Sequence, residues 1–150
     1  MHLPKVMPFR RNPLYFFTAC TAGRKSLLAC QAAHEILTEV WMRSRRLDGW
    51  AVGRYVLMPD HVHFFARPTH ESKSLSAWHQ TWKSMTARKL GVAPGCRSPI
   101  WQPETFDHIL RSAESYAEKW HYVQQNPVRA HLVTTPDDWP WQGEIESLQF

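Results

Sequence analysis

The sequence contains few cysteines and no pair of them at a metal-binding spacing. Its 150 residues include only Cys20, Cys30 and Cys96, an odd number without a C-x-x-C motif. Disulfide frameworks use even numbers of cysteines, and zinc knuckles use closely spaced pairs. We therefore expect free thiols in a reducing compartment.

Long apolar runs and two common enzyme motifs are also missing. No apolar stretch approaches the roughly 20 residues that span a membrane, and the first residues lack the apolar core of a signal peptide. The phosphate-binding loop G-x-x-x-x-G-K-[ST] is absent, as is the zinc motif H-E-x-x-H. We expect a cytoplasmic protein that makes no membrane contact.

Length and composition favour one folded domain. Apolar residues make up 43% of the 150 residues, which is enough for a hydrophobic core. We expect a single domain over residues 1–150. Within it, residues 1–13 are predicted to form an N-terminal arm and residues 134–150 an irregular tail.

Positive charge is concentrated in the first part of the chain. Residues 1–90 carry 14 Lys and Arg against 5 Asp and Glu, whereas residues 91–150 carry 4 against 8. A basic surface attracts polyanions, of which nucleic acid is the commonest. The alternative, a solvated surface of an ordinary basic protein, stays open at this point.

Two of the eight tryptophans lie close to basic residues in the sequence. Trp78 and Trp82 precede Lys83, Arg88 and Lys89, a mixture that suits stacking on unpaired bases beside phosphates. We predict such stacking for both indoles. The candidate DNA-contacting cations are Arg10, Arg11, Arg24, Lys25, Lys83, Arg88 and Lys89.

The periodicity of apolar residues predicts an α+β fold. Strands rich in aromatic and β-branched residues alternate with helices in the order β-α-β-β-α-β, followed by one more helix. This order is that of the ferredoxin-like fold, an antiparallel sheet with two helices on one face. The predicted strands are 15–21, 50–58, 61–67 and 105–109, and the predicted helices are 26–46, 74–90 and 112–126.

The second and third predicted strands form a hairpin whose turn is Pro59-Asp60. Side chains alternate along a strand, so His61 and His63 project from one face and Val62 from the other. Two imidazoles side by side on a strand form half of a metal site. A half-buried strand whose polar face simply carries histidines is the alternative.

The last predicted helix carries a second group of candidate residues. Its apolar stripe contains Tyr116 and Trp120, whereas Tyr122 lies off this stripe, four residues before Asn126. The Asn126 carbonyl oxygen is a suitable ligand for Mg²⁺ or Mn²⁺, and the Tyr122 phenol is a possible nucleophile. Alternatively, Tyr122 is an amphipathic anchor and Asn126 a helix-end residue before Pro127.

Three segments together resemble the REP-associated tyrosine transposases, which are single-tyrosine HUH nucleases. They are MPDHVH at 58–63, WQPETFDHIL at 101–110 and YVQQNPVRAHLV at 122–133, and the likeness extends from about residue 15 to 141. The resemblance implies that His61, His63 and Asn126 bind Mg²⁺ or Mn²⁺ and that Tyr122 is the nucleophile. His131 stands where glycine is expected, which puts that turn in doubt.

The resemblance also implies an activity. It would be a single-stranded DNA endonuclease and strand transferase that acts on hairpin repeats through a 5′-phosphotyrosine, as a monomer or homodimer near the bacterial nucleoid. No general base is evident, and Glu118 or a metal-bound water are the candidates. Two other classes stay open: a non-enzymatic nucleic-acid-binding module, and a zinc hydrolase using some of the nine histidines and Cys96.

Overall fold

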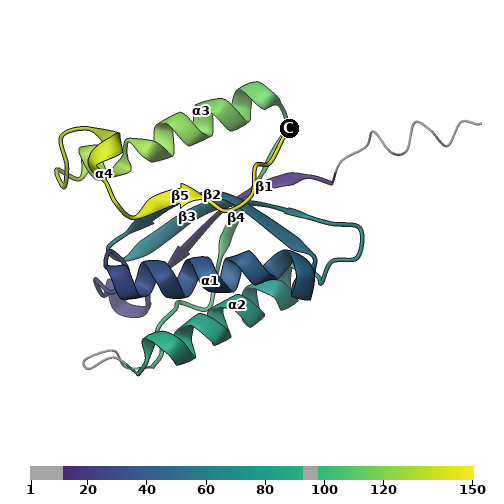
Figure 1. The fold of residues 1–150 in the computed structure, drawn as a ribbon, viewed down its shortest axis with the longest axis horizontal. Coiled ribbons are helices and arrows are strands. Elements are labelled where there is room, and N and C mark those ends of the chain that lie inside the picture. Colours follow the sequence, from purple (N-terminus) through teal and green to yellow (C-terminus); the bar gives the residue numbers. More distant parts are fainter. Residues whose placement is uncertain (1–11, 93–97) are drawn as a thin grey trace, which may run out of the picture.

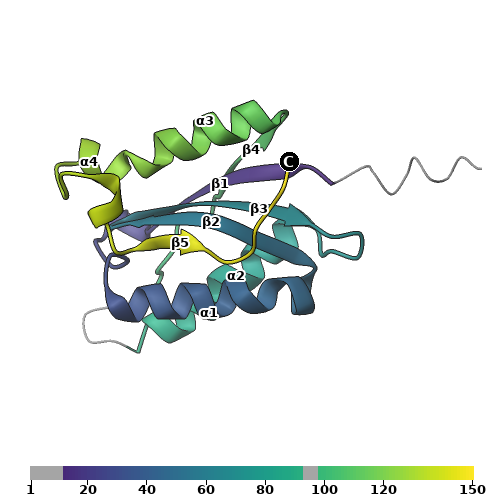
Figure 2. The same cartoon turned by 45° about the horizontal axis from the view of Figure 1, so that its top comes forward.

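A five-stranded antiparallel sheet organises the computed structural model, which describes residues 12–92 and 98–150. Its main elements, in chain order, are β1 (Leu14–Cys20), α1 (Gln31–Asp48), β2 (Trp50–Met58), β3 (His61–Pro68), α2 (Leu75–Leu90), β4 (Phe106–Leu110), α3 (Ala113–Gln124), α4 (Asn126–Arg129) and β5 (Gln142–Glu144). The strands lie in the order β4-β1-β3-β2-β5. Helices α1 and α2 cover one face of the sheet and α3 lies over the other (Figure 1), as the turned view also shows (Figure 2).

The predicted ferredoxin-like arrangement is confirmed. Helix α1 carries the chain from β1 to β2, which run in the same direction, and β3 pairs between them, antiparallel to both. The tight turn at Pro59 and Asp60 lets β3 fold back into this space, so that Met58 pairs with His61. Strand β4 then pairs with β1 at the sheet edge.

Aromatic side chains fill the layer between the sheet and helices α1 and α2. Phe17 and Phe64 from the sheet meet Trp41, Trp78 and Trp82 from the helices, and each is at most 1% exposed. The prediction that Trp78 and Trp82 stack on bases is therefore wrong. These two indoles are four residues apart on α2, so they share the helix face that packs on the sheet.

Helix α1 begins at Gln31 rather than at Ser26 as predicted. The backbone N–H groups of Leu27 and Leu28 both donate to the carbonyl of Pro59, at 2.9 and 3.0 Å. These hydrogen bonds hold the segment against the β2–β3 turn. The helical periodicity of the apolar residues does extend into this segment. Hydrogen bonds to the hairpin nevertheless keep the segment out of α1.

The last helix ends earlier than predicted and is followed by a second one. Helix α3 begins after Ser112, whose side chain caps it as predicted, and it ends at Gln124. Asn126 then opens the separate short helix α4, with Pro127 in its first turn. Proline is tolerated there because the first N–H groups of a helix have no intrahelical partner. Asn126 thus starts a helix instead of ending one.

Part of the tail forms regular structure, contrary to the prediction that residues 134–150 are irregular. A 3₁₀ turn, η3 (Pro136–Asp138), precedes β5, which pairs with β2 at the second sheet edge. The buried indole of Trp139 donates to the carbonyl of Leu57 at 2.9 Å. The tail therefore extends the sheet beside the hairpin.

The structure describes two of the three cysteines and does not describe two of the predicted DNA contacts. Cys20 and Cys30 are free thiols, as expected, whereas Cys96, Arg10 and Arg11 lie outside the described residues. Within residues 12–92 and 98–150, no helix is both long and apolar enough to cross a membrane.

Candidate active site

The two histidines of the hairpin face α3. In β3, Val62 and Phe64 are fully buried toward α1 and α2, while His61 and His63 project from the opposite face with ring centroids 4.8 Å apart. This is the alternation expected of a strand. The prediction that the two imidazoles lie side by side is confirmed.

A cavity of about 500 Å³ unites the predicted site residues. His61 and His63 line it from β3, Tyr122 from α3 and Asn126 from α4. Residues some 60 positions apart in the sequence therefore meet in one place. The Tyr122 side chain is not buried, because the residue is 61% exposed.

Each imidazole is held through its Nδ1 atom. The Nδ1 atom of His61 lies 2.8 Å from a carboxylate oxygen of Asp60, and that of His63 lies 2.8 Å from the hydroxyl of Thr18. A carboxylate accepts only, so Nδ1 of His61 donates to it. If Nδ1 of His63 likewise donates to Thr18, the Nε2 lone pair of each ring is available to a metal.

Burial keeps His63 neutral. Desolvation, followed by the positive charges of His61, Lys119 and Arg129, lowers the pKa of His63 to about 3. A neutral imidazole is the form that binds metals. At neutral pH His63 is thus in the required state.

Asp60 is held as a carboxylate by two partners. Partial burial raises its pKa, but hydrogen bonds from Arg24 and His61 outweigh this effect and hold the pKa below its usual value. The Arg24 Nε atom donates to one Asp60 oxygen at 3.0 Å, and His61 donates to the other at 2.8 Å. Asp60 therefore joins a basic side chain to a candidate metal ligand.

Arg129 connects Asn126 to Tyr122. Its guanidinium lies 4.0 Å from the centroid of the Tyr122 ring, donates to the Tyr122 carbonyl at 2.8 Å, and also donates to the amide oxygen of Asn126. A cation over an aromatic face is an attractive contact. The oxygen that would bind a metal thus accepts a hydrogen bond from a neighbouring cation, and an amide oxygen has a second lone pair for a metal.

The donors suit a divalent cation in kind. Two imidazole nitrogens and one carboxamide oxygen, from His61, His63 and Asn126, are ligand types that Mn²⁺ and related ions accept. Within the described parts of the chain, no cluster of three or more His, Cys, Asp or Glu side chains offers another metal site. The zinc-hydrolase alternative therefore gains no support there.

Sequence reasoning missed two cations of the cavity, Lys119 and Arg129. Both line it, and the Lys119 ammonium lies 5.1 Å from the centroid of the Phe16 ring. Their spacing was a usable signal: Lys119 lies three residues before Tyr122, and Arg129 three after Asn126. Glu118, a candidate base, is not among the residues that line the cavity.

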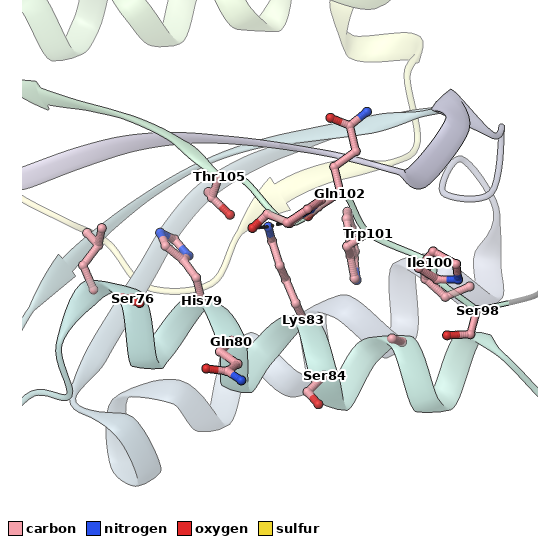
Figure 3. A pocket seen from close by; sticks show the side chains of 14 residues that line it. Ser76, His79, Gln80, Lys83, Ser84, Ser98, Ile100, Trp101, Gln102 and Thr105 are labelled. Atoms are coloured by element: carbon pink, nitrogen blue, oxygen red, sulfur yellow. Dashed lines mark hydrogen bonds between the residues drawn. The ribbon is translucent and has the colours of Figure 1, made fainter.

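Lys83 is not available to bind DNA, contrary to prediction. It lines a second cavity of about 600 Å³, between α2 and residues 98–105 (Figure 3). Its buried ammonium donates to the carbonyls of Gln102, Pro103 and Glu104 at 3.0, 3.4 and 2.9 Å. Burial lowers the pKa of Lys83 to about 8. This lysine holds the segment before β4 against α2.

The other predicted DNA contacts are scattered. Lys25 is exposed, whereas Arg24 is bound to Asp60. Arg88 and Lys89 are exposed on α2, across the sheet from the candidate site, and Lys89 forms an ion pair with Glu39 at 3.2 Å (Figure 2). A DNA-binding role for these residues stays a prediction.

The fold and the cavity agree with the resemblance found in the sequence. One strand of the ferredoxin-like sheet carries the paired histidines. These histidines line the same cavity as an exposed tyrosine on a separate helix. This is the arrangement expected of a single-tyrosine HUH transposase. No protein-family model matches the chain.

Known proteins confirm the resemblance to REP-associated tyrosine transposases. The Escherichia coli K12 REP-associated tyrosine transposase is 28% identical over 129 residues, which cover 85% of this chain and 73% of the relative. A Haemophilus influenzae protein provisionally assigned to the same group is 24% identical over 146 residues, covering 90% and 81%.

Solved structures share the fold. A REP-associated tyrosine transposase bound to a REP hairpin matches with a TM-score of 0.74 and 22% identity, over 89% of this chain and 77% of that one. A Deinococcus radiodurans protein provisionally called a transposase matches with a TM-score of 0.56 and 17% identity, over 78% and 93%. At these identities the matches establish the fold.

Proposed function

We propose that this chain is a metal-dependent nuclease and strand transferase that uses Tyr122 to cut single-stranded or hairpin DNA. The observation that carries the proposal is the cavity that Tyr122 shares with His61, His63 and Asn126. An exposed tyrosine beside paired imidazoles is difficult to explain by folding alone, because Tyr122 and the two imidazoles lie outside the aromatic core between the sheet and helices α1 and α2.

The chemistry would be a transesterification at phosphorus. The Tyr122 oxygen forms a bond to phosphorus and the bond to the 3′ oxygen breaks, which yields a 5′-phosphotyrosine and a free 3′-OH. The phenol loses its proton and the leaving oxygen gains one, so that the step is balanced. One phosphodiester replaces another of similar energy, and rejoining therefore needs no ATP.

The side chains that line the cavity would have different roles in the reaction. His61, His63 and Asn126 would hold Mg²⁺ or Mn²⁺, which polarises the phosphate and stabilises charge on the leaving oxygen. Arg129 stacks on the Tyr122 ring and restricts the positions of the phenol. Lys119 and Arg129 give the cavity positive charge, which attracts the DNA backbone. A phenol has a pKa of about 10 and needs help to ionise, and we assign no residue to that role.

The substrate class follows from the relatives. One structural neighbour is bound to a REP hairpin, and we propose a hairpin with an unpaired flank as the substrate here. The flank must be single-stranded so that the backbone can bend into the cavity. We further propose that residues 1–150 act as one domain, in the cytoplasm with the chromosomal DNA.

A covalent-adduct gel tests the proposal. The purified protein is incubated with Mn²⁺ and labelled hairpin oligonucleotides that carry unpaired flanks, and the adduct is resolved under denaturing conditions. Wild-type protein should form an adduct and Tyr122→Phe should form none. Tyr116→Phe is the matched control, because the Tyr116 hydroxyl on the same helix is buried and has no hydrogen-bond partner among residues 12–92 and 98–150.

The outcome separates the enzyme from a DNA-binding module. An adduct that survives in Tyr122→Phe refutes the assignment of the nucleophile. Hairpin binding without any adduct, unaffected by EDTA or by His61→Ala, supports the non-enzymatic alternative instead.

A further inference from the structure

The loop between β1 and α1 is hydrogen-bonded to the turn that precedes His61. The backbone N–H of Thr21 donates to the carbonyl of Asp60 at 3.0 Å, and the Thr21 hydroxyl lies 3.1 Å from the same oxygen. Thr21 is fully buried. Together with the bonds from Leu27 and Leu28 to Pro59, these contacts fix both residues of the turn from outside the hairpin.

Within this loop Arg24 has a strained backbone. It lies at the end of the 3₁₀ turn η2 (Ala22–Arg24) with φ of +52°, directly after Gly23 with φ of +65°. Left-handed backbone costs free energy for a residue with a Cβ atom, whereas glycine adopts it readily. Such strain persists where the surrounding structure enforces it, and it is concentrated at functional sites.

The side chain of Arg24 explains why an arginine occupies this position. Its Nε donates to one oxygen of Asp60 at 3.0 Å, and the other oxygen of Asp60 accepts from Nδ1 of His61 at 2.8 Å. A guanidinium nitrogen of Arg24 also lies 3.5 Å from this Nδ1. Without a fixed carboxylate between them, Arg24 would favour an unprotonated Nδ1, which is the wrong tautomer for metal binding through Nε2.

We propose that Arg24 is a positioning residue that locks the Asp60 carboxylate onto Nδ1 of His61 and so presents the Nε2 lone pair of His61 to the metal. The inference rests on the proposed metal site for its purpose, but the hydrogen bonds on which it depends are present without metal. The left-handed backbone of Arg24 directs its side chain to Asp60. The strain is thus explained by the site and not by the fold.

The tautomer of His61 is the first measurement. Two-bond ¹⁵N–¹H NMR spectra of metal-free protein at pH 8 show which ring nitrogen carries the proton, and a His61→Gln variant assigns the signals. Wild-type protein should show the proton on Nδ1. In Arg24→Gly the signals should shift toward a mixture with the proton on Nε2, because Asp60 is then free to turn away.

The second measurement is the affinity for Mn²⁺, determined by calorimetry. Removing a cation near a cation site should tighten binding by simple electrostatics. We expect the opposite for Arg24→Gly, a loss of about tenfold, as for other residues that orient metal ligands. Lys25→Ala is the matched control: it removes the adjacent exposed cation, has an ordinary φ of −70° and should not weaken binding.

Thermal unfolding shows whether Arg24→Gly still folds. Its Tm should equal or exceed that of the wild type, because glycine relieves the left-handed strain and a partly exposed ion pair contributes little. A structural role for Arg24 would lower the Tm instead.

The proposal requires both the altered tautomer and the weaker binding. It is overturned if Arg24→Gly keeps the Nδ1 proton, or if it binds Mn²⁺ as tightly as the wild type. If wild-type protein binds no Mn²⁺, the proposed function fails, and the metal-free spectra alone then support or overturn the positioning of His61.

Discussion

The two faces of the sheet have different properties. The face covered by α1 and α2 is a closed aromatic core that includes Trp41, Phe64 and Trp82. The face below α3 has a smaller apolar cluster around Phe65, and beside it the cavity remains open. Strand β3 belongs to both, because its side chains alternate. One strand can therefore provide stability and candidate chemistry without conflict.

The cations on the two faces differ in the same way. Lys83, on the face of α1 and α2, is buried and bound to three backbone carbonyls. Arg129, beside the cavity, is exposed and packs on the ring of Tyr122. A positive charge next to an aromatic residue in the sequence therefore does not identify a DNA contact. Both cations donate to backbone carbonyls, and what distinguishes them is that Lys83 is buried whereas Arg129 is exposed beside the cavity.

The largest effect on stability is expected from Trp82→Ala. This indole is fully buried against Trp41, Phe64 and Trp101, and its N–H donates to His79 at 2.9 Å. Truncation should lower the free energy of unfolding by about 3–5 kcal/mol, measured by urea denaturation.

The exposed Met42 on α1 provides the control for this variant. It is 65% exposed, and Met42→Ala should cost less than about 0.5 kcal/mol. A loss below about 1 kcal/mol in Trp82→Ala would contradict the view that the aromatic face carries the stability.

A pH-dependent effect on stability is expected from His79. Burial, followed by the charge of Lys83, lowers its pKa to about 4, against about 6.5 in the unfolded chain. Between these values the unfolded state binds more protons, so the free energy of unfolding falls as the pH falls from 6.5 to 4. At pH 5 the loss should be about 2 kcal/mol.

The variant His79→Gln isolates this contribution. Glutamine can still accept the Trp82 hydrogen bond but does not titrate, so its stability should fall less between pH 7 and pH 5 than that of the wild type. His63 also has a lowered pKa and titrates in both proteins. Equal slopes for the two proteins would show that His79 is not the buried group responsible.

Much of the fold and the geometry of the site could be predicted from the sequence. Alternation placed His61 and His63 on one face, and helical spacing placed Tyr122 off the apolar stripe. These are local rules that the backbone enforces wherever the segment lies. The meeting of the two segments was predicted only through the family resemblance, because spacing says nothing about contacts between distant elements.

The predictions were wrong where contacts between residues far apart in the sequence determine the structure. The hairpin turn holds Leu27 and Leu28 out of α1, and β5 forms because β2 offers a free edge. The basic residues that follow Trp78 and Trp82 in the sequence suggest a DNA contact, although the four-residue spacing of the two indoles already places both on one helix face. The role of Arg24 required a backbone angle and a side-chain contact, neither of which a sequence displays.

A small effect on stability, with a clear effect on the site, is expected from Thr18→Val. The Thr18 hydroxyl contacts Nδ1 of His63 at 2.8 Å from the neighbouring strand β1. Valine has nearly the same shape and suits a strand, so the free energy of unfolding should change by less than about 1 kcal/mol. His63 would lose the contact that orients its ring, and the affinity for Mn²⁺ should fall about tenfold, or about 1.4 kcal/mol.

Thr18→Ser keeps the hydroxyl and should bind Mn²⁺ like the wild type, because the polar contact and not the methyl group positions the imidazole. Equal affinities for the valine and serine variants would mean that packing alone orients His63, and the two faces of β3 would then be less independent than their contacts indicate.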